Sequence, residues 1–155
     1  MEFIIFLGKL DKEILELLKK ANYLVEENKI ECLINKEIKG LHNFKENKIV
    51  ICTANAKWKT KYRGIKTHSN KDNIKMESAI RKALRHEATH AVQKCNGNKI
   101  VGDLKNLESK LHQSKRKALE FSTSKFSGTY AKEVEAYILE HKPRKVKEML
   151  KKYCL

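Results

Sequence analysis

The sequence predicts an α+β domain that is mostly helical and has a small sheet. Apolar residues recur with a helical period over most of the chain, and short runs rich in β-branched residues interrupt this pattern in the first third. One proline and six glycines among 155 residues are few for an all-β protein, which needs a turn after every strand. Apolar residues make up 41% of the chain, enough for one modest core, so we expect residues 1–155 to form a single domain.

The first half of the chain should contain both helix and strand. A helix is expected over Leu10–Asn28, because its apolar residues follow a helical period and Asp11 suits its start. Ile30–Ile34 and Lys48–Thr53 are short β-branched runs between polar turns, and we expect them to be strands. Lys57–Lys75 is basic and polar and should form a loop, whose length suggests a role in binding.

The second half of the chain should be helical. Its helices are expected at Met76–Lys94, Leu104–Phe121, Tyr130–His141 and Pro143–Tyr153. Asn96-Gly97 supplies a stop for the first of these helices, and Thr123–Gly128 breaks the pattern between the second and the third. Pro143 suits the first turn of the last helix, because its missing N–H would have no partner there.

The helix Met76–Lys94 carries the motif His86-Glu87-x-x-His90. Histidines four residues apart lie one turn apart on the same side of an α-helix, so both imidazoles can face one metal ion. Neutral imidazole is a good ligand for zinc. Glu87 lies about 100° around the helix from His86, which places its carboxylate beside the ion and within reach of a zinc-bound water. The motif therefore predicts a Zn2+ site in which Glu87 acts as the general base.

The residues around this motif favour a metal site over a chance match. The helix is amphipathic, and Ala79 and Ala83 lie on the stripe that carries His86 and His90. Small side chains at these positions would leave room for a cleft. We therefore expect the two histidines on a partly buried edge of the helix.

A catalytic zinc site also needs a third protein ligand and one open position. Glu133 and Glu135, on the helix Tyr130–His141, are the candidates. The helical wheel does not decide between them, because both flank the inner face of that helix. Glu133 shares its side with Tyr137 and Glu140, groups that could orient a ligand, so it is the preferred assignment and Glu135 is the alternative.

This order of motifs resembles the gluzincin class of zinc metallopeptidases, in which a glutamate on a later helix completes the site, commonly in a Glu-x-x-small pattern. Glu133-Val134-Glu135-Ala136 matches that pattern with Glu133 as the ligand. The resemblance implies a minimal zincin-like domain, with a small sheet packed on the H-E-x-x-H helix, and hydrolysis of peptide bonds. It also implies that His86, His90 and Glu133 bind the metal and that Glu87 is catalytic.

A closer similarity is to the zinc proteases of the mitochondrial intermembrane space that process a subunit of the ATP synthase. The shared features are Ile51-Cys52 with Asn55 nearby, the H-E-x-x-H motif with Ala91 and Cys95 after it, and Glu133 with Ala136. The chain is also similar to uncharacterised short proteins of marine cyanobacteria and their phages. These have the same motif order and a Lys-Lys-Tyr-Cys end.

Charge and cysteine content indicate partners and compartment. The chain has 34 Lys and Arg against 19 Asp and Glu, a net charge of +15, but its lysines are spread along the sequence, so any nucleic-acid binding should be weak and non-specific.

The apolar run Phe3–Leu7 is too short for a signal core or a membrane span, so we expect no membrane partner and a cytoplasmic location. Free thiols are expected in that compartment, and Cys52 and Cys95 could lie close together.

The remaining candidate residues are weaker. His112 and Tyr137 could stabilise an oxyanion, and His112 could replace the glutamates as third ligand, but single residues of these types on a helix more often serve packing or face solvent. His42, His68 and His141 have no motif context and are interpreted as having no role in the site.

The sequence thus favours a zinc-dependent metallopeptidase with a peptide or protein substrate. The strand Lys48–Thr53 is expected to form the edge of the cleft and to pair with an extended peptide. The alternative is a basic nucleic-acid-binding or phage accessory protein whose metal site is structural or inactive.

Overall fold

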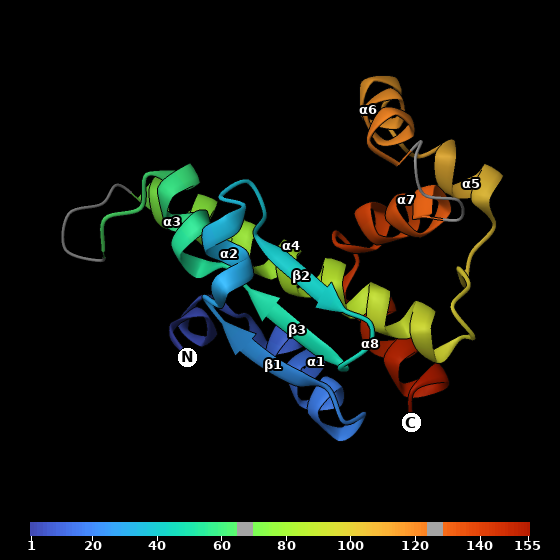
Figure 1. Cartoon of the computed structure of the whole chain (residues 1–155), viewed down its shortest axis with the longest axis horizontal. Coiled ribbons are helices and arrows are strands. Elements are labelled where there is room, and N and C mark those ends of the chain that lie inside the picture. Colours follow the sequence, from blue (N-terminus) through green and yellow to red (C-terminus); the bar gives the residue numbers. More distant parts are fainter. Residues whose placement is uncertain (65–69, 124–128) are drawn as a thin grey trace.

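The computed structural model describes residues 1–64, 70–123 and 129–155, and it has the expected α+β architecture, mostly helical with a small sheet (Figure 1). A short 3-10 helix, η1 (Glu2–Phe6), precedes the first α-helix. The helices are α1 (Lys9–Lys20), α2 (Ile30–Ile34), α3 (Thr53–Thr60), α4 (Asn70–Cys95), α5 (Leu104–Glu108), α6 (Gln113–Thr123), α7 (Thr129–Leu139) and α8 (Pro143–Tyr153). The strands are β1 (Leu24–Glu27), β2 (Gly40–Asn43) and β3 (Lys48–Ile51).

The three strands form one sheet with the order β1-β3-β2. β3 is the central strand and pairs in parallel with β1 and antiparallel with β2. Its side chains alternate, so that Ile49 and Ile51 enter the main core while Val50 faces the opposite side of the sheet. The prediction that Lys48–Thr53 forms the cleft edge is therefore wrong, because β2 occupies that edge.

The long helix α4 is the element around which the others pack. It contacts β2 and β3 of the sheet and also α1, α3, α7 and α8 (Figure 1). Ile80, Leu84, Ala88 and Val92 are fully buried along it and belong to the main core. The prediction of a helix at Met76–Lys94 is confirmed, and α4 extends it at both ends. The predicted helices at Tyr130–His141 and Pro143–Tyr153 are also present, as α7 and α8.

The first helix is shorter than predicted, because a residue with a left-handed backbone conformation, Asn22, ends it. Asn22 has a φ of 61°, and the backbone N–H groups of Asn22 and Tyr23 donate to the carbonyls of Lys19 and Leu18. This is the hydrogen-bond pattern of a Schellman cap. The chain then reverses, and Leu24–Glu27, predicted as the end of the helix, forms β1.

Ile30–Ile34 was predicted as a strand but forms the short helix α2. Tertiary contacts explain the difference. The side-chain amide of Asn55 on α3 donates to the carbonyls of Cys32, Asn35 and Ile38, so it fixes the backbone of α2 and of the segment after it. These partners lie about twenty residues away in the sequence, where a local β-branched pattern carries no information about them.

Two further predicted boundaries differ from the structure. The helix α3, Thr53–Thr60, takes the last residue of the predicted strand Lys48–Thr53 and the first four of the predicted loop Lys57–Lys75. The helix α4 begins within that loop, at Asn70, while residues 65–69 lie outside the described part of the chain. The predicted helix Leu104–Phe121 is two helices, α5 and α6, and the His112 ring accepts a hydrogen bond from the Ser114 backbone where α6 begins. Most of the predicted break Thr123–Gly128 falls on residues 124–128, which are also outside the described residues.

The cysteines form two disulfides, so the prediction of free thiols is wrong. Cys32 pairs with Cys52 and links α2 to the end of the central strand, and Cys95 pairs with Cys154 and ties the end of α4 to the end of α8. Cys52 and Cys95 are not partners. In the described part of the chain, no helix combines the length and the apolar character that crossing a bilayer requires.

Candidate metal centre

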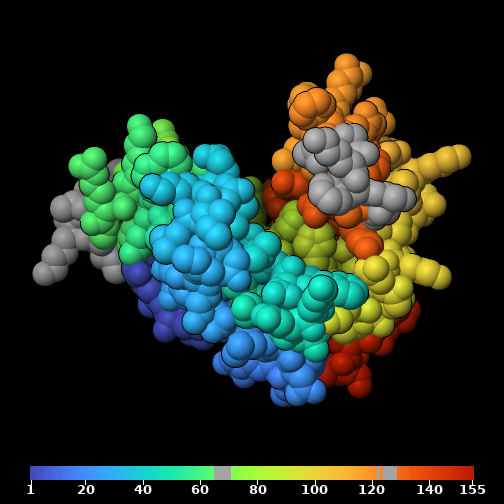
Figure 2. All heavy atoms as spheres, viewed as in Figure 1, coloured from blue at the N-terminus to red at the C-terminus, as the bar shows by residue number. Residues whose placement is uncertain are grey.

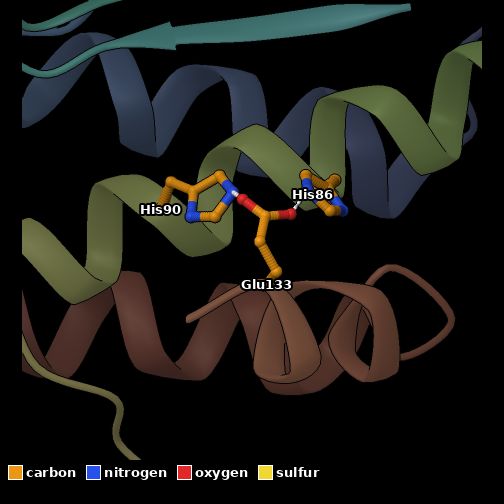
Figure 3. Close-up of side chains that lie close together, drawn as sticks. All are labelled: His86, His90 and Glu133. Atoms are coloured by element: carbon orange, nitrogen blue, oxygen red, sulfur yellow. Dashed lines mark hydrogen bonds and ion pairs between the residues drawn. The ribbon is translucent and has the colours of Figure 1, made fainter. Parts of the chain in front are cut away.

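Two helices bring the three predicted ligands together. His86 and His90 lie on α4, and Glu133 on α7 places its carboxylate between the two imidazole rings (Figure 3). The Nε2 atom of His86 is 3.2 Å from Oε2 of Glu133, and the Nε2 atom of His90 is 3.1 Å from Oε1. One ligand atom from each residue lies within 4.8 Å of the others, so a single ion could contact all three.

The other nitrogen of each imidazole ring is held by a neighbouring side chain. Nδ1 of His86 lies 3.3 Å from Oε2 of Glu140, and Nδ1 of His90 lies 2.8 Å from Oε1 of Gln93. Hydrogen bonds at Nδ1 fix the tautomer and the orientation of a metal-binding histidine. When each imidazole is neutral and its Nδ1 donates to that oxygen, the lone pair of its Nε2 atom is available to a metal ion, and both Nε2 atoms lie beside the Glu133 carboxylate.

Glu135, the alternative third ligand, faces away from the histidines. Its carboxylate accepts from Nε2 of Gln93 at 2.9 Å and from the backbone N–H groups of Val101 and Gly102 at 2.9 and 2.7 Å. The side chain is only 1% exposed. Glu135 therefore holds Gln93, which in turn holds His90.

The donor set fits a divalent transition metal. Two imidazole nitrogens and one carboxylate oxygen are the protein ligands of many catalytic zinc sites, which keep a fourth position for water or substrate. Neighbours that hold Nδ1 are also typical of such sites. His86, His90 and Glu133 are the residues that would hold the ion.

Glu87 lies beside this group and is buried, with 7% of its surface exposed. Its carboxylate rests against the backbone of Gly40 on β2. A Cβ atom on Gly40 would come within 2.8 Å of Cγ and Oε1 of Glu87, a contact closer than side chains tolerate. Glycine at this position allows the sheet edge to approach the motif helix closely enough to confine Glu87.

The four titratable groups strongly affect one another. Burial opposes protonation of His86, but hydrogen bonds with Glu133 and Glu140 outweigh it and raise the pKa of His86 to about 10. Burial also opposes protonation of His90, yet Glu133 and Glu87 raise its pKa. Burial would raise the pKa of Glu133, but the two histidines hold that pKa well below its usual range. Burial raises the pKa of Glu87 despite the two histidines. The metal-free centre therefore holds protons that a cation would replace.

A cleft leads to the centre from the surface. A cavity of about 350 Å³ is lined by Leu41, His42 and Phe44 from the sheet edge and its turn, and by His86, His90 and Glu133. Figure 2 shows the cleft as a notch with α2 and β2 (light blue to cyan) on one side, α6 and α7 (orange to red) on the other, and α4 (yellow-green) at its base. Solvent and an extended bound molecule can thus reach His86, His90 and Glu133.

One histidine for which the sequence indicates no role, His42, also borders the centre. The ring of His42 on β2 stacks 6.3 Å from that of His90, and its Nε2 atom is buried without a hydrogen-bond partner among the described residues. Burial, with the nearby charges of His90 and Lys94, lowers the pKa of His42 to about 4. His42 is therefore neutral at physiological pH.

The other weak candidates differ in their position relative to the metal centre. The Tyr137 ring packs edge-on against His86, 4.8 Å between centroids, so this tyrosine borders the centre. His112 is exposed and bonds to Ser114, away from the three ligands. His141 is exposed, and His68 lies outside the described residues. Glu140 was expected to orient Glu133 but lies at Nδ1 of His86 instead. Gln93 and Gly40 were missed as site residues, although Gln93 is three residues after His90, the spacing at which helix neighbours touch.

Fold and site define an α+β protein with a candidate H-E-x-x-H metal centre at the base of a cleft. The chain belongs to the family described as a domain of unknown function, DUF8637, whose model matches residues 3–155. Comparison with the curated proteins and with the solved structures finds no match.

Proposed function

We propose that the protein is a zinc-dependent metallopeptidase that hydrolyses peptide bonds. One observation carries the proposal: His86, His90 and Glu133 converge with both Nδ1 atoms already held, and the buried carboxylate of Glu87 lies next to them. A purely structural metal site needs no such acid beside it. The resemblance to gluzincins, noted from the motif order, supports the same assignment.

Each residue has a part in the proposed reaction. Zinc would supply a Lewis acid that lowers the pKa of the attacking water and polarises the scissile carbonyl. Glu87 takes a proton from that water and returns it to the leaving amine, so the nitrogen departs as a neutral group. Glu140 and Gln93 keep the histidines in the orientation that binding requires. The free edge of β2 offers backbone groups with which an extended peptide can pair next to Glu87.

The proposal is tested by comparing metal content and hydrolysis in the same preparations. Wild type should hold one zinc per chain and cleave a casein or peptide-library substrate. Glu87→Gln should keep its zinc but lose about 10²–10⁴-fold in rate, because an amide cannot accept the proton. His90→Ala should lose both zinc and activity. Wild-type hydrolysis in Glu87→Gln would remove the general-base role, and equal zinc in His90→Ala would remove the site.

The compartment follows from the state of the cysteines. A cytoplasmic protein is expected to keep its thiols reduced, whereas the pairs Cys32–Cys52 and Cys95–Cys154 are typical of an oxidising environment. Alkylation of the protein in its own cells, followed by mass spectrometry, distinguishes the two. Four alkylated cysteines would support the cytoplasmic location, and two intact disulfides would replace it with an oxidising compartment.

A further inference from the structure

The cleft continues past the metal centre toward the beginning of α4. A second hollow of about 440 Å³ shares Gly40, His86 and Glu87 with the first, so the two adjoin at the metal centre, and together we call them the groove. Ala79 and Ala83, predicted to leave room for a cleft, line it on α4. A peptide bound across the centre would therefore extend into this hollow.

Three lysines from three separate parts of the chain line this hollow, and we call them the cationic end of the cleft: Lys39, Lys82 and Lys115. Lys82 lies on α4 four residues before His86, on the stripe that carries both histidines. Lys39 directly precedes β2. Lys115 on α6 places its ammonium 3.7 Å from the centre of the Tyr137 ring.

The positive charge of this end is not neutralised from within the described part of the chain. None of its three lysines forms an ion pair with a described carboxylate. Three carboxylates line the same hollow, and none of them forms an ion pair with these lysines. Glu37 pairs with Lys59, Glu140 lies 3.3 Å from Nδ1 of His86, and Glu87 is buried against Gly40.

The other end of the groove differs. There Lys132 donates to the side chain of Asn98 at 2.5 Å, and Lys94 donates to the carbonyl of Phe44. Leu41 and Phe44 give that wall an apolar character. Among the described residues, Lys132 is the single lysine that lines this first hollow, against three lysines at the cationic end, so the positive charge of the groove is concentrated on one side of the metal centre.

We propose that the cationic end is a subsite for acidic side chains, and that the preferred ligands are peptides with Asp or Glu on one side of the residue held at the centre. A peptide is favoured over a nucleic acid because Lys39 adjoins the free edge of β2, where backbone pairing suits an extended chain. The claim that acidic peptides are the preferred substrates rests on the proposed peptidase function. The claim that acidic peptides bind at the cationic end does not depend on that function.

The test is a binding measurement by fluorescence anisotropy. A labelled peptide with two adjacent glutamates and its Gln-Gln counterpart are titrated with zinc-loaded full-length Glu87→Gln, in which cleavage is suppressed. The acidic peptide should bind about tenfold more tightly, since three partly exposed lysine contacts each contribute modestly. Equal affinities would overturn the proposal.

Two triple variants with the same change in net charge locate the effect. Lys39→Gln/Lys82→Gln/Lys115→Gln removes the cationic end. Lys12→Gln/Lys20→Gln/Lys151→Gln removes three lysines that line a separate hollow between α1 and α8. The first variant should lose the preference for the acidic peptide, and the second should keep it. An equal loss in both would assign the preference to overall charge and overturn the subsite. Lys82→Gln alone, with unchanged zinc content, serves if the triple variant folds poorly.

The outcomes separate this inference from the proposed function. Selective binding of the acidic peptide without cleavage by wild type would support the subsite and contradict the peptidase. Cleavage of both peptides with equal kcat/KM would support the peptidase and contradict the subsite. A single-stranded oligonucleotide that displaces the peptide at lower concentration than the unlabelled peptide would assign the cationic end to nucleic acid and overturn the inference.

Discussion

Each histidine of the candidate centre depends on a neighbour at its far nitrogen, and the two neighbours differ. His86 faces a carboxylate, Glu140, whereas His90 faces the neutral amide of Gln93. A carboxylate partner makes an imidazole more basic and a stronger ligand than an amide partner does. Gln93 in turn is oriented by the buried Glu135. The two glutamates of the Glu133-Val134-Glu135 segment thus have distinct positions, one between the rings and one behind them.

The first prediction at this scale separates these two glutamates. Glu133→Gln should weaken zinc binding more than Glu135→Gln, because it removes a direct donor, while loss of a supporting residue costs about 10–100-fold in affinity. Zinc affinity is measured by competition with a chromophoric chelator. His112→Ala, far from the centre, is the control and should bind as wild type does. Loss confined to Glu135→Gln would reverse the assignment, and loss in neither would place the third ligand elsewhere.

The second prediction concerns pH. Metal-free His86 is protonated at neutral pH, because its pKa is raised to about 10, and only neutral imidazole binds zinc. Zinc binding at pH 7 should therefore release at least one proton, and affinity should rise by about tenfold per pH unit for each proton released. Calorimetry in buffers of different ionisation enthalpy counts these protons. Zinc binding that releases none at pH 7 would contradict the protonated state of His86.

At the residue scale, the sequence predicted what lies close along one helix. The spacing of His86 and His90 fixes their common side without further knowledge of the fold. His42 and Gly40 escaped notice because they reach the centre only through packing of β2 on α4, more than forty residues away in the chain. Glu133 was preferred over Glu135 because of its neighbours on the same helix and the Glu-x-x-small pattern, since a helical wheel does not contain the angle at which α7 meets α4.

At the scale of elements, the strand β2 has the largest bearing on the proposed chemistry. It was not predicted at all, since Gly40–Asn43 has one aliphatic residue and no alternating pattern. It forms because β3 pairs with it across a turn in which the Asn43 side chain accepts from the backbone of Lys45 and Glu46. The predicted strand β3 and the helices α4, α7 and α8 had strong local patterns. The misassigned segments Leu24–Glu27 and Ile30–Ile34 depended on a left-handed Asn22 and on Asn55.

The prediction at this scale tests the contact between β2 and the motif helix. Gly40→Ala places a methyl group where Glu87 now lies, so the carboxylate must move. A displacement of about 1 Å at a catalytic group can cost on the order of 10²-fold in rate. We expect kcat/KM to fall by about that factor while zinc content stays at wild-type level. Gly8→Ala, at a negative φ of −78° and with Asp11 and Arg81 as the nearest neighbours of the added methyl group, controls for general effects of the substitution on activity. Unchanged hydrolysis in Gly40→Ala would show that Glu87 is not confined by β2.

At the scale of the whole molecule, two groups of elements face each other across α4. The sheet with α1, α3 and α8 forms the main core, and α5, α6 and α7 form a smaller cluster around Leu107, Leu119, Val134 and Ile138. The ligands therefore come from the base and one side of the cleft, His86 and His90 from α4 at its base and Glu133 from the smaller cluster. Metal binding should hold the two groups together, since an ion that binds only the folded arrangement stabilises it.

The net charge of +15 is a property of the whole molecule, because most lysines are not among the residues that line the two hollows of the cleft. Away from the cleft, a hollow between α1 and α8 is lined by Lys9, Lys12, Lys20 and Lys151. No aromatic side chain is among the residues that line it, so a nucleic acid bound there would contact the lysine ammonium groups without base stacking. Lysines contact phosphates and do not read base edges, so such a surface binds nucleic acid without regard to sequence. Binding of this kind depends steeply on salt, because each phosphate contact releases a counterion.

The last prediction follows from that surface. Labelled DNA duplexes of two unrelated sequences should bind weakly and with equal affinity, and affinity should fall steeply between 50 and 200 mM salt. Lys12→Gln/Lys20→Gln/Lys151→Gln should make the plot of log affinity against log salt shallower by up to about 0.9 for each contact removed. The variant of the cationic end serves as the control with equal charge, and its slope should change less. A tight complex that prefers one sequence at physiological salt would favour the nucleic-acid-binding alternative over the peptidase, because scattered lysines cannot produce such selectivity.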